Sequence, residues 1–147
     1  MDNKDKKQKQ RYVSEIAIRE PIEKPTEHSV DKDIEWICEC LGLADKEDDL
    51  ATSIFKELLH ATKERDGISS KEITEKKNVT QGAIVYHLNI FMSSGLVIKQ
   101  GRRYFLRSTS LDETIEELEH DLLRRMRKLR ELAKHIDKEM EEMFREL

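Results

Sequence analysis

Two cysteines stand two positions apart, in Cys38-Glu39-Cys40, and their side chains could bind a soft metal. Thiolates, with a histidine contributed from elsewhere, can hold zinc or a metalloid. The surrounding pattern predicts a helix, however, and positions i and i+2 of a helix do not face each other. Cys38 also falls on the apolar stripe, where a thiol behaves as a small hydrophobe. We therefore expect no metal site and no cofactor.

Catalytic motifs are not found along the chain. Nothing resembles a phosphate-binding glycine loop, a nucleophile elbow or a zinc-protease pair. His60 and His87 stand on different predicted elements, and His120 and His135 lie 15 positions apart on a third, so none of them has ligand spacing. Carboxylates are abundant, but on helices at i, i+4 they usually form a solvated face. We do not expect an enzyme.

Basic residues are concentrated in one stretch of an otherwise acidic chain. The net charge is −4 over 147 residues, yet positions 68–107 hold seven basic and two acidic residues and carry +5. The flanking positions 31–66 and 111–147 sum to −6 and −4. A local patch, and not the total charge, governs attraction to a nucleic acid. Lys99, Arg102 and Arg103 cluster around Gly101, where phosphate oxygens would be the natural partner.

The basic stretch has the order of two short helices followed by a β-hairpin. Caps and turn residues mark each boundary, because a hydroxyl satisfies an orphan N–H and a residue such as asparagine tolerates a left-handed turn. Gly101 supplies the freedom that a tight hairpin needs. The pattern predicts a helix over 71–77 capped by Ser69 or Ser70, a left-handed Asn78, a helix over 81–92 capped by Thr80, and strands over 96–98 and 103–106.

The second of these helices presents two different faces. Ile84, Leu88 and Phe91 recur at i, i+4 and i+7 and define the buried stripe. On the opposite side a glutamine could pair with adenine, small residues permit close approach, and valine or tyrosine can meet a thymine methyl. The alternative is an ordinary amphipathic helix with a polar solvent face. The outward set is Gln81, Gly82, Val85, Tyr86 and Asn89.

The segment TQGAIVYHLNIFMSSGLV, positions 80–97, resembles the recognition helix and first wing strand of arsenical-repressor-type (ArsR-like) winged-helix regulators. The matching elements are Thr80-Gln81, Ile84, His87-Leu88 and Gly95-Leu96-Val97. The resemblance extends over about 50–107, and related multidrug-resistance-type regulators share much of it. It implies that the recognition helix meets bases while the wing touches the DNA backbone. The expected DNA-binding residues are Ser70, Lys71, Thr80, Gln81, Gly82, Ala83, Val85, Tyr86, Asn89, Lys99, Arg102 and Arg103.

The chain departs from this family at the sensor. Arsenical repressors often carry a Cys-x-Cys near the start of the helix-turn-helix, and the corresponding ISSKEIT here has none. Positions before the basic stretch predict helices over 31–43 and 47–65, the second with Leu50, Ile54, Leu58 and Ala61 on one face. Positions 1–30, with two prolines, predict a flexible basic arm that either reaches into a DNA groove or stays solvated.

Positions 111–147 contain no glycine or proline and predict one long helix, capped by Ser110 or Asp112. Its apolar residues alternate in steps of four and three, apart from one stutter near Leu122. A helix this long must bury its stripe on a partner, and the simplest partner is a second copy. The alternative is that its first half packs on the domain and its second half frays. The expected dimerisation residues are Leu118, Leu122, Met126, Leu129, Ala133, Ile136 and Met140.

Together these features predict a mainly α fold with a small β-wing: a winged helix-turn-helix domain over 31–110 and a C-terminal coiled-coil helix over 111–147. The expected function is sequence-specific transcriptional regulation by a homodimer on double-stranded DNA, with helix 80–92 in the major groove and wing 96–107 on phosphate. The alternative is a winged-helix and coiled-coil module for protein contacts. RNA binding is a third possibility. No signal or membrane segment is found, so we expect a cytoplasmic location.

Overall fold

The computed structural model describes residues 18–20, 29–45, 48–64 and 66–146. Most of the predicted N-terminal arm, 1–30, therefore lies outside the described residues. The chain divides into two units between Thr114 and Ile115, and each is considered by itself. The elements run in the order α2 (Val30–Cys40), α3 (Asp49–Lys63), β1 (Ile68–Ser69), α4 (Ser70–Lys77), α5 (Gln81–Ser93), β2 (Val97–Gln100), β3 (Arg103–Leu106) and α6 (Leu111–Arg145).

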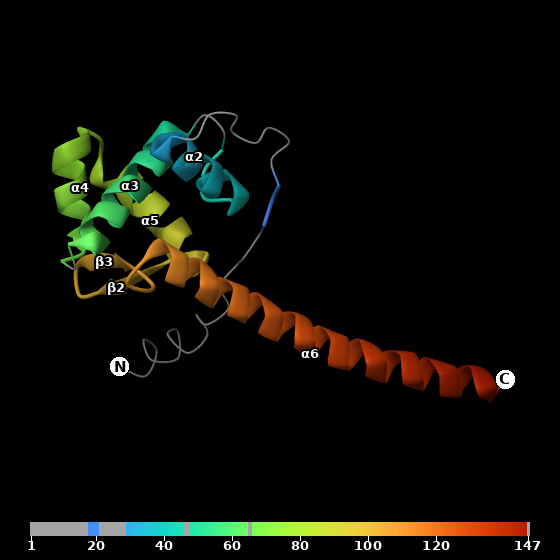
Figure 1. Cartoon of the computed structure of the whole chain (residues 1–147). Coiled ribbons are helices and arrows are strands. Elements are labelled where there is room, and N and C mark those ends of the chain that lie inside the picture. The colour runs from blue at the N-terminus through green and yellow to red at the C-terminus, as the bar shows by residue number, and fades with distance from the viewer. Residues whose placement is uncertain (1–17, 21–28, 46–47, 65, 147) are drawn as a thin grey trace. The chain divides into compact units, whose positions relative to one another are not determined.

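The predicted fold class is confirmed, since helices dominate and a β-hairpin follows α5 (Figure 1). The sheet has one more strand than predicted: β1 pairs antiparallel with β3, which places Ile68 opposite Tyr104 and gives the order β1-β3-β2. A two-residue strand carries no periodicity, so only the neighbouring β3 makes it recognisable. In the hairpin, Gln100 lies opposite Arg103, and Gly101 at the turn has a φ of 63°.

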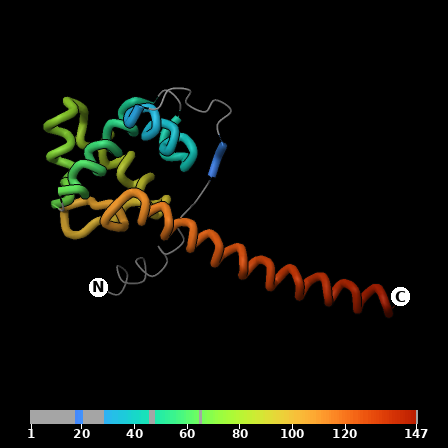
Figure 2. The backbone as a smooth tube through the Cα atoms, in the orientation of Figure 1, coloured from blue at the N-terminus to red at the C-terminus, as the bar shows by residue number. Residues whose placement is uncertain are grey.

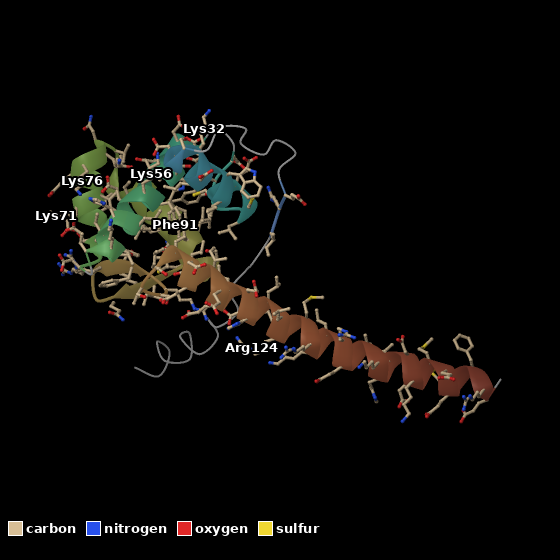
Figure 3. All side chains as sticks on the ribbon, viewed as in Figure 1. Lys32, Lys56, Lys71, Lys76, Phe91 and Arg124 are labelled. Atoms are coloured by element: carbon tan, nitrogen blue, oxygen red, sulfur yellow. The ribbon has the colours of Figure 1, made fainter. Side chains whose placement is uncertain are left out.

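The core of the first unit lies between α3, α5 and the sheet. Phe55 of α3 and Phe91 of α5 are fully buried, and their rings meet edge to face with centroids 5.8 Å apart. Edge-to-face contact aligns the positive rim of one ring with the negative face of the other. The predicted stripe of α5 is confirmed, because Ile84, Leu88 and Phe91 are all fully buried. Figure 3 labels Phe91 among the helices.

The buried face of α3 differs from the predicted one. Ala51, Ile54 and Leu58 are buried, whereas Leu50 and Ala61 are only half-buried. Thr62 replaces Ala61 on this face because its hydroxyl donates to the carbonyl of Leu58 at 2.8 Å and accepts from the backbone N–H of Leu106 at 3.2 Å. A polar residue that joins a helix to a strand is invisible to an apolar pattern.

The first helix, α2, ends at Cys40, three residues earlier than predicted. Gly42 adopts a φ of 68°. The N–H of Leu43 donates to the carbonyl of Cys38 at 2.8 Å, and the N–H of Gly42 donates to the carbonyl of Glu39 at 3.1 Å. These two bonds form a Schellman motif, in which a left-handed glycine satisfies the last carbonyls of the helix. Leu43 is consequently buried rather than helical.

The last helix, α6, has nearly the predicted length and begins where Ser110 accepts a hydrogen bond from the backbone N–H of Glu113 at 3.1 Å. Ser110, and not Asp112, is therefore its cap.

Of the expected dimerisation residues, Leu118 is buried and Leu122 is half-buried, while Met126, Leu129, Ala133, Ile136 and Met140 are exposed. Among the described residues, no helix is long and apolar enough to cross a membrane.

Candidate nucleic-acid interface

Local hydrogen bonds fix the turn between α4 and α5. Figure 2 shows the path of the backbone through this turn. Ser69 caps α4 through the N–H of Glu72, and the Glu72 carboxylate accepts from the N–H of Ser69, which completes a capping box. Asn78 ends α4 in the left-handed conformation, with φ 52° and ψ 43°. Thr80 then caps α5 by accepting from the N–H of Ala83. The three predicted boundary residues are confirmed.

A side-chain hydrogen bond joins the beginnings of the two helices. The amide nitrogen of Gln81 donates to the hydroxyl of Ser70 at 3.1 Å. Ser70 and Gln81 are two of the expected DNA-binding residues, and the structure brings them together from positions eleven apart. Lys71 follows Ser70 on the exposed side of α4, where Figure 3 labels it with Lys76. The start of α5 thus lies beside exposed positive charge.

The solvent side of α5 carries the remaining residues that were expected to meet bases. Gln81, Gly82 and Asn89 are exposed, Tyr86 is 64% exposed, and Ala83 and Val85 are half-buried. A Cβ added at Gly82 would meet nothing within 4 Å, so packing inside the domain does not require a glycine at this position. One accessible face therefore combines an amide, a small residue and an aromatic ring, the chemistry that can read base edges.

The hairpin presents its basic residues in three different ways. Lys99 lies over the ring of Tyr104, with its ammonium 5.3 Å from the ring centroid, and Arg102 is exposed at the turn. Within the described part of the chain, neither Lys71 nor Arg102 forms an ion pair. Both charges are therefore available for phosphate oxygens.

Arg103, by contrast, is partly exposed but is bound to other residues of the first unit. Its Nη1 and Nη2 donate to the two oxygens of Glu72 at 2.9 and 3.3 Å, and its Nε donates to the carbonyl of Asp66 at 2.7 Å. Nη2 also donates to the carbonyl of Gly67 at 3.0 Å. The hydrogen bond from Arg103 lowers the pKa of Glu72 below its usual value. Arg103 has a structural role, and its contact with DNA stays a prediction.

Two lysines of α4 are also engaged. Lys76 and Lys77 each place their ammonium 3.3 Å from an oxygen of Glu57 on α3. Burial alone would raise the pKa of Glu57, but hydrogen bonds from both lysines outweigh it and lower that pKa. Part of the +5 of the basic stretch is therefore balanced by an acidic residue from another element.

The sequence reading missed Arg19, which the structure places beside the outward face of α5. The backbone N–H of Arg19 donates to the carbonyl of Cys40 at 2.7 Å. Arg19 lines an open hollow of about 350 Å³ together with Leu43, Tyr86 and Asn89. A single arginine in a polar stretch carries no periodic signal, so nothing in the sequence indicated this position.

The remaining chemistry-bearing residues are packed inside. Cys38 is fully buried, and burial raises the pKa of its thiol to about 12, so the metal-binding thiolate is disfavoured. Among the described residues, no group of three potential ligands could hold a metal ion. His87 is buried, and its ring packs edge-on against that of Tyr86 at 5.3 Å between centroids. These contacts favour a packing role for His87.

The order of elements in the first unit, together with the three-stranded sheet and its hairpin, resembles a winged-helix domain, here followed by a long C-terminal helix. No family model, curated protein or solved structure matches this chain significantly.

Proposed function

We propose that this chain is a non-enzymatic, ArsR-like transcriptional regulator that binds double-stranded DNA in a sequence-specific manner as a homodimer. Helix α5 enters the major groove with its exposed face towards the bases, and the hairpin contacts the phosphate backbone. The observation that carries the proposal is the hydrogen bond between Gln81 and Ser70. It places the capped starts of α4 and α5 side by side, next to Lys71.

Electrostatics support this arrangement. The first turn of a helix directs unpaired N–H groups and a partial positive charge outward, which suits a phosphate oxygen. Lys71 and Arg102 add full charges that no carboxylate of the described residues neutralises. Lys99 adds a third exposed charge on β2. These residues position the protein on the backbone, whereas Gln81 and Tyr86 supply sequence preference.

The test is selection of bound duplexes from random DNA, followed by titration of the selected site at several salt concentrations. We expect enrichment of a palindrome, and a logarithm of affinity that falls linearly with the logarithm of salt. Arg102→Ala should make the slope of log affinity against log salt less negative by about one unit, since one phosphate contact is lost. Lys32→Ala, which removes an exposed charge from α2, is the control and should leave the slope unchanged.

The substitution Gln81→Ala should act differently from Arg102→Ala. It should reduce affinity for the selected site by about tenfold and broaden the base preference, with little change in the salt slope. Failure to bind any duplex at low salt would reject the proposal and favour a module for protein contacts.

A further inference from the structure

The second unit exposes a continuous apolar stripe along α6. Leu129, Ile136 and Met143 are 60, 51 and 62% exposed. Exposure of apolar side chains to water costs free energy, and here it recurs at every turn of the helix. An exposed apolar stripe of this length therefore marks an interaction surface. The further exposed members are Leu123, Met126, Leu132, Met140 and Phe144.

The spacing of the stripe is that of a coiled coil. From Leu122 onward, steps of four and three alternate without a break, which is a 3.5-residue repeat. Met126, Ala133 and Met140 occupy the a positions, and Leu122, Leu129, Ile136 and Met143 occupy the d positions. The flanking e positions are Leu123, Arg130, Asp137 and Phe144, and the g positions are Arg125, Leu132, Glu139 and Glu146.

The flanking charges are sorted along the helix. Positions 124–134 hold six basic residues and one acidic residue, and positions 137–146 hold five acidic and two basic residues. In a parallel pair in register, a g residue faces the e residue five positions later in the other helix. Arg125 would then face Arg130 of the second copy, and no flanking pair of opposite charge would form. Charge therefore disfavours the parallel arrangement.

An antiparallel pair matches apolar and charged positions together. With Ala133 opposite Ile136 of the second copy, Leu129 lies opposite Met140 and Met126 lies opposite Met143, each layer occurring twice by symmetry. In this register Arg130 flanks Asp137 of the second copy, and Leu123 flanks Phe144 of the second copy. Leu123 and Phe144, two of the three exposed apolar residues at flanking positions, thereby cover each other across the interface.

Other antiparallel registers bring like charges together. A shift of one heptad in one direction places Arg130 beside Arg130 of the second copy. A shift in the other direction places Asp137 beside Asp137, and Glu139 beside Glu139. Like charges in direct contact destabilise such pairs, so one register is preferred.

We propose that the segment 122–146 of α6 pairs with the same segment of a second copy as an antiparallel coiled coil in which Ala133 lies opposite Ile136. This inference rests on the homodimer within the proposed function and adds its orientation and register. A second copy is the partner that fits the stripe, because in the antiparallel pair the basic half of each α6 lies beside the acidic half of the other.

Charge reversal gives opposite results for the two orientations. In the antiparallel pair, Arg130→Glu places a second carboxylate beside Asp137 at both symmetry-related contacts, so the dimer dissociation constant should rise about tenfold or more in sedimentation equilibrium. Adding Asp137→Arg should restore it. In a parallel pair, Arg130→Glu would relieve the repulsion by Arg125 and lower the dissociation constant. Arg127→Glu, the same change at an outward b position, is the matched control and should have little effect.

Cysteine cross-linking tests the register directly in the full-length chain. Cys40→Ser provides the background, since Cys38 is buried. Chains with Met126→Cys should form disulfides with chains carrying Met143→Cys, while neither variant should cross-link with itself. In a parallel pair each variant should cross-link with itself. The mixed disulfide should not form there, because 17 residues of helix separate the two thiols by about 25 Å. Homodisulfides, or a monomer at about 50 µM, would overturn the inference.

The failure of this inference and the failure of the proposed function are distinguishable. A palindrome bound by a dimer that cross-links in parallel would reject the orientation alone. A chain that cross-links between positions 126 and 143 but binds no duplex at low salt would reject the DNA-binding function alone.

Discussion

The Arg103 guanidinium and the Glu72 carboxylate form a two-pronged ion pair, with Nη1 2.9 Å from Oε1 and Nη2 3.3 Å from Oε2. Glu72 also accepts from the N–H of Ser69 and so completes the capping box of α4. One carboxylate therefore joins the wing strand β3 to the start of α4. This link joins the hairpin to the start of α4 within the first unit.

Arg103→Ala should destabilise the fold more than Arg102→Ala. The first substitution removes hydrogen bonds to Glu72 and to the carbonyls of Asp66 and Gly67, and should lower the free energy of unfolding by about 2 kcal/mol. Arg102 is exposed at the turn, so its replacement should change that free energy by less than about 0.5 kcal/mol. Urea denaturation measures both, and equal effects would contradict the structural role of Arg103.

Glu72 should contribute to the loss of stability in acid. The hydrogen bond from Arg103 lowers the pKa of Glu72 in the folded state. The contribution is therefore complete above the unfolded pKa, about 4.3, and is lost as the pH falls through the folded pKa. Glu72→Gln keeps the hydrogen bond to the N–H of Ser69 but should reduce the fall in unfolding free energy between about pH 5 and 3. Glu75→Gln, an exposed carboxylate on the same helix, is the control and should retain the original fall.

The thiol of Cys38 should be inert in the folded chain. Burial raises its pKa to about 12, so at pH 8 the reactive thiolate is scarce and unreachable. Alkylation should label the half-buried Cys40 first, and Cys38 only at the rate of unfolding. Cys40→Ser removes the faster phase. Rapid labelling of both thiols, or a rise in melting temperature on adding zinc, would show that Cys38 is accessible or binds metal.

Two glycines should respond to alanine in opposite ways. At Gly67, with φ 65°, a Cβ would lie 2.6 Å from the ring of Phe105, so Gly67→Ala should lower the free energy of unfolding by about 2 kcal/mol or more. Gly82 is helical with open space around it, and Gly82→Ala should raise that free energy by about 0.5 kcal/mol. The same variant should weaken DNA binding if the backbone at Gly82 approaches the bases. Thermal and urea denaturation check the first two effects, and DNA titration checks the third.

The local features of the winged-helix domain were predictable from the sequence, and the reasons are visible at particular residues. Thr80 accepts from an N–H three positions later, and Asn78 adopts a left-handed turn within a few residues of the helices it joins. The stripe of Ile84, Leu88 and Phe91 depends only on helical spacing. The candidate interface on α5 followed from the same spacing, since its exposed face is the opposite of that stripe.

What sequence reasoning missed depends on contacts between distant positions. Strand β1 exists because β3 lies beside it, and the paired positions are 34 and 36 residues apart in the chain. Two residues have no pattern of their own. Thr62 joins the core through the N–H of Leu106, and Arg19 reaches the side of α5 through the carbonyl of Cys40. Such residues are polar, and their role depends on the partner and not on their spacing.

By itself the sequence predicted where the helices lie, the caps of α4 and α5, the hairpin and the repeat along α6, because each depends on interactions within about one or two turns of chain. Only the tertiary structure decided which of the basic residues are available to a nucleic acid. Arg103, Lys76 and Lys77 look equivalent to Lys71 and Arg102 in the sequence, yet Glu72 and Glu57 engage them. The physical reason is that an ion pair depends on distance in space, and here folding sets that distance between residues 19 to 31 positions apart.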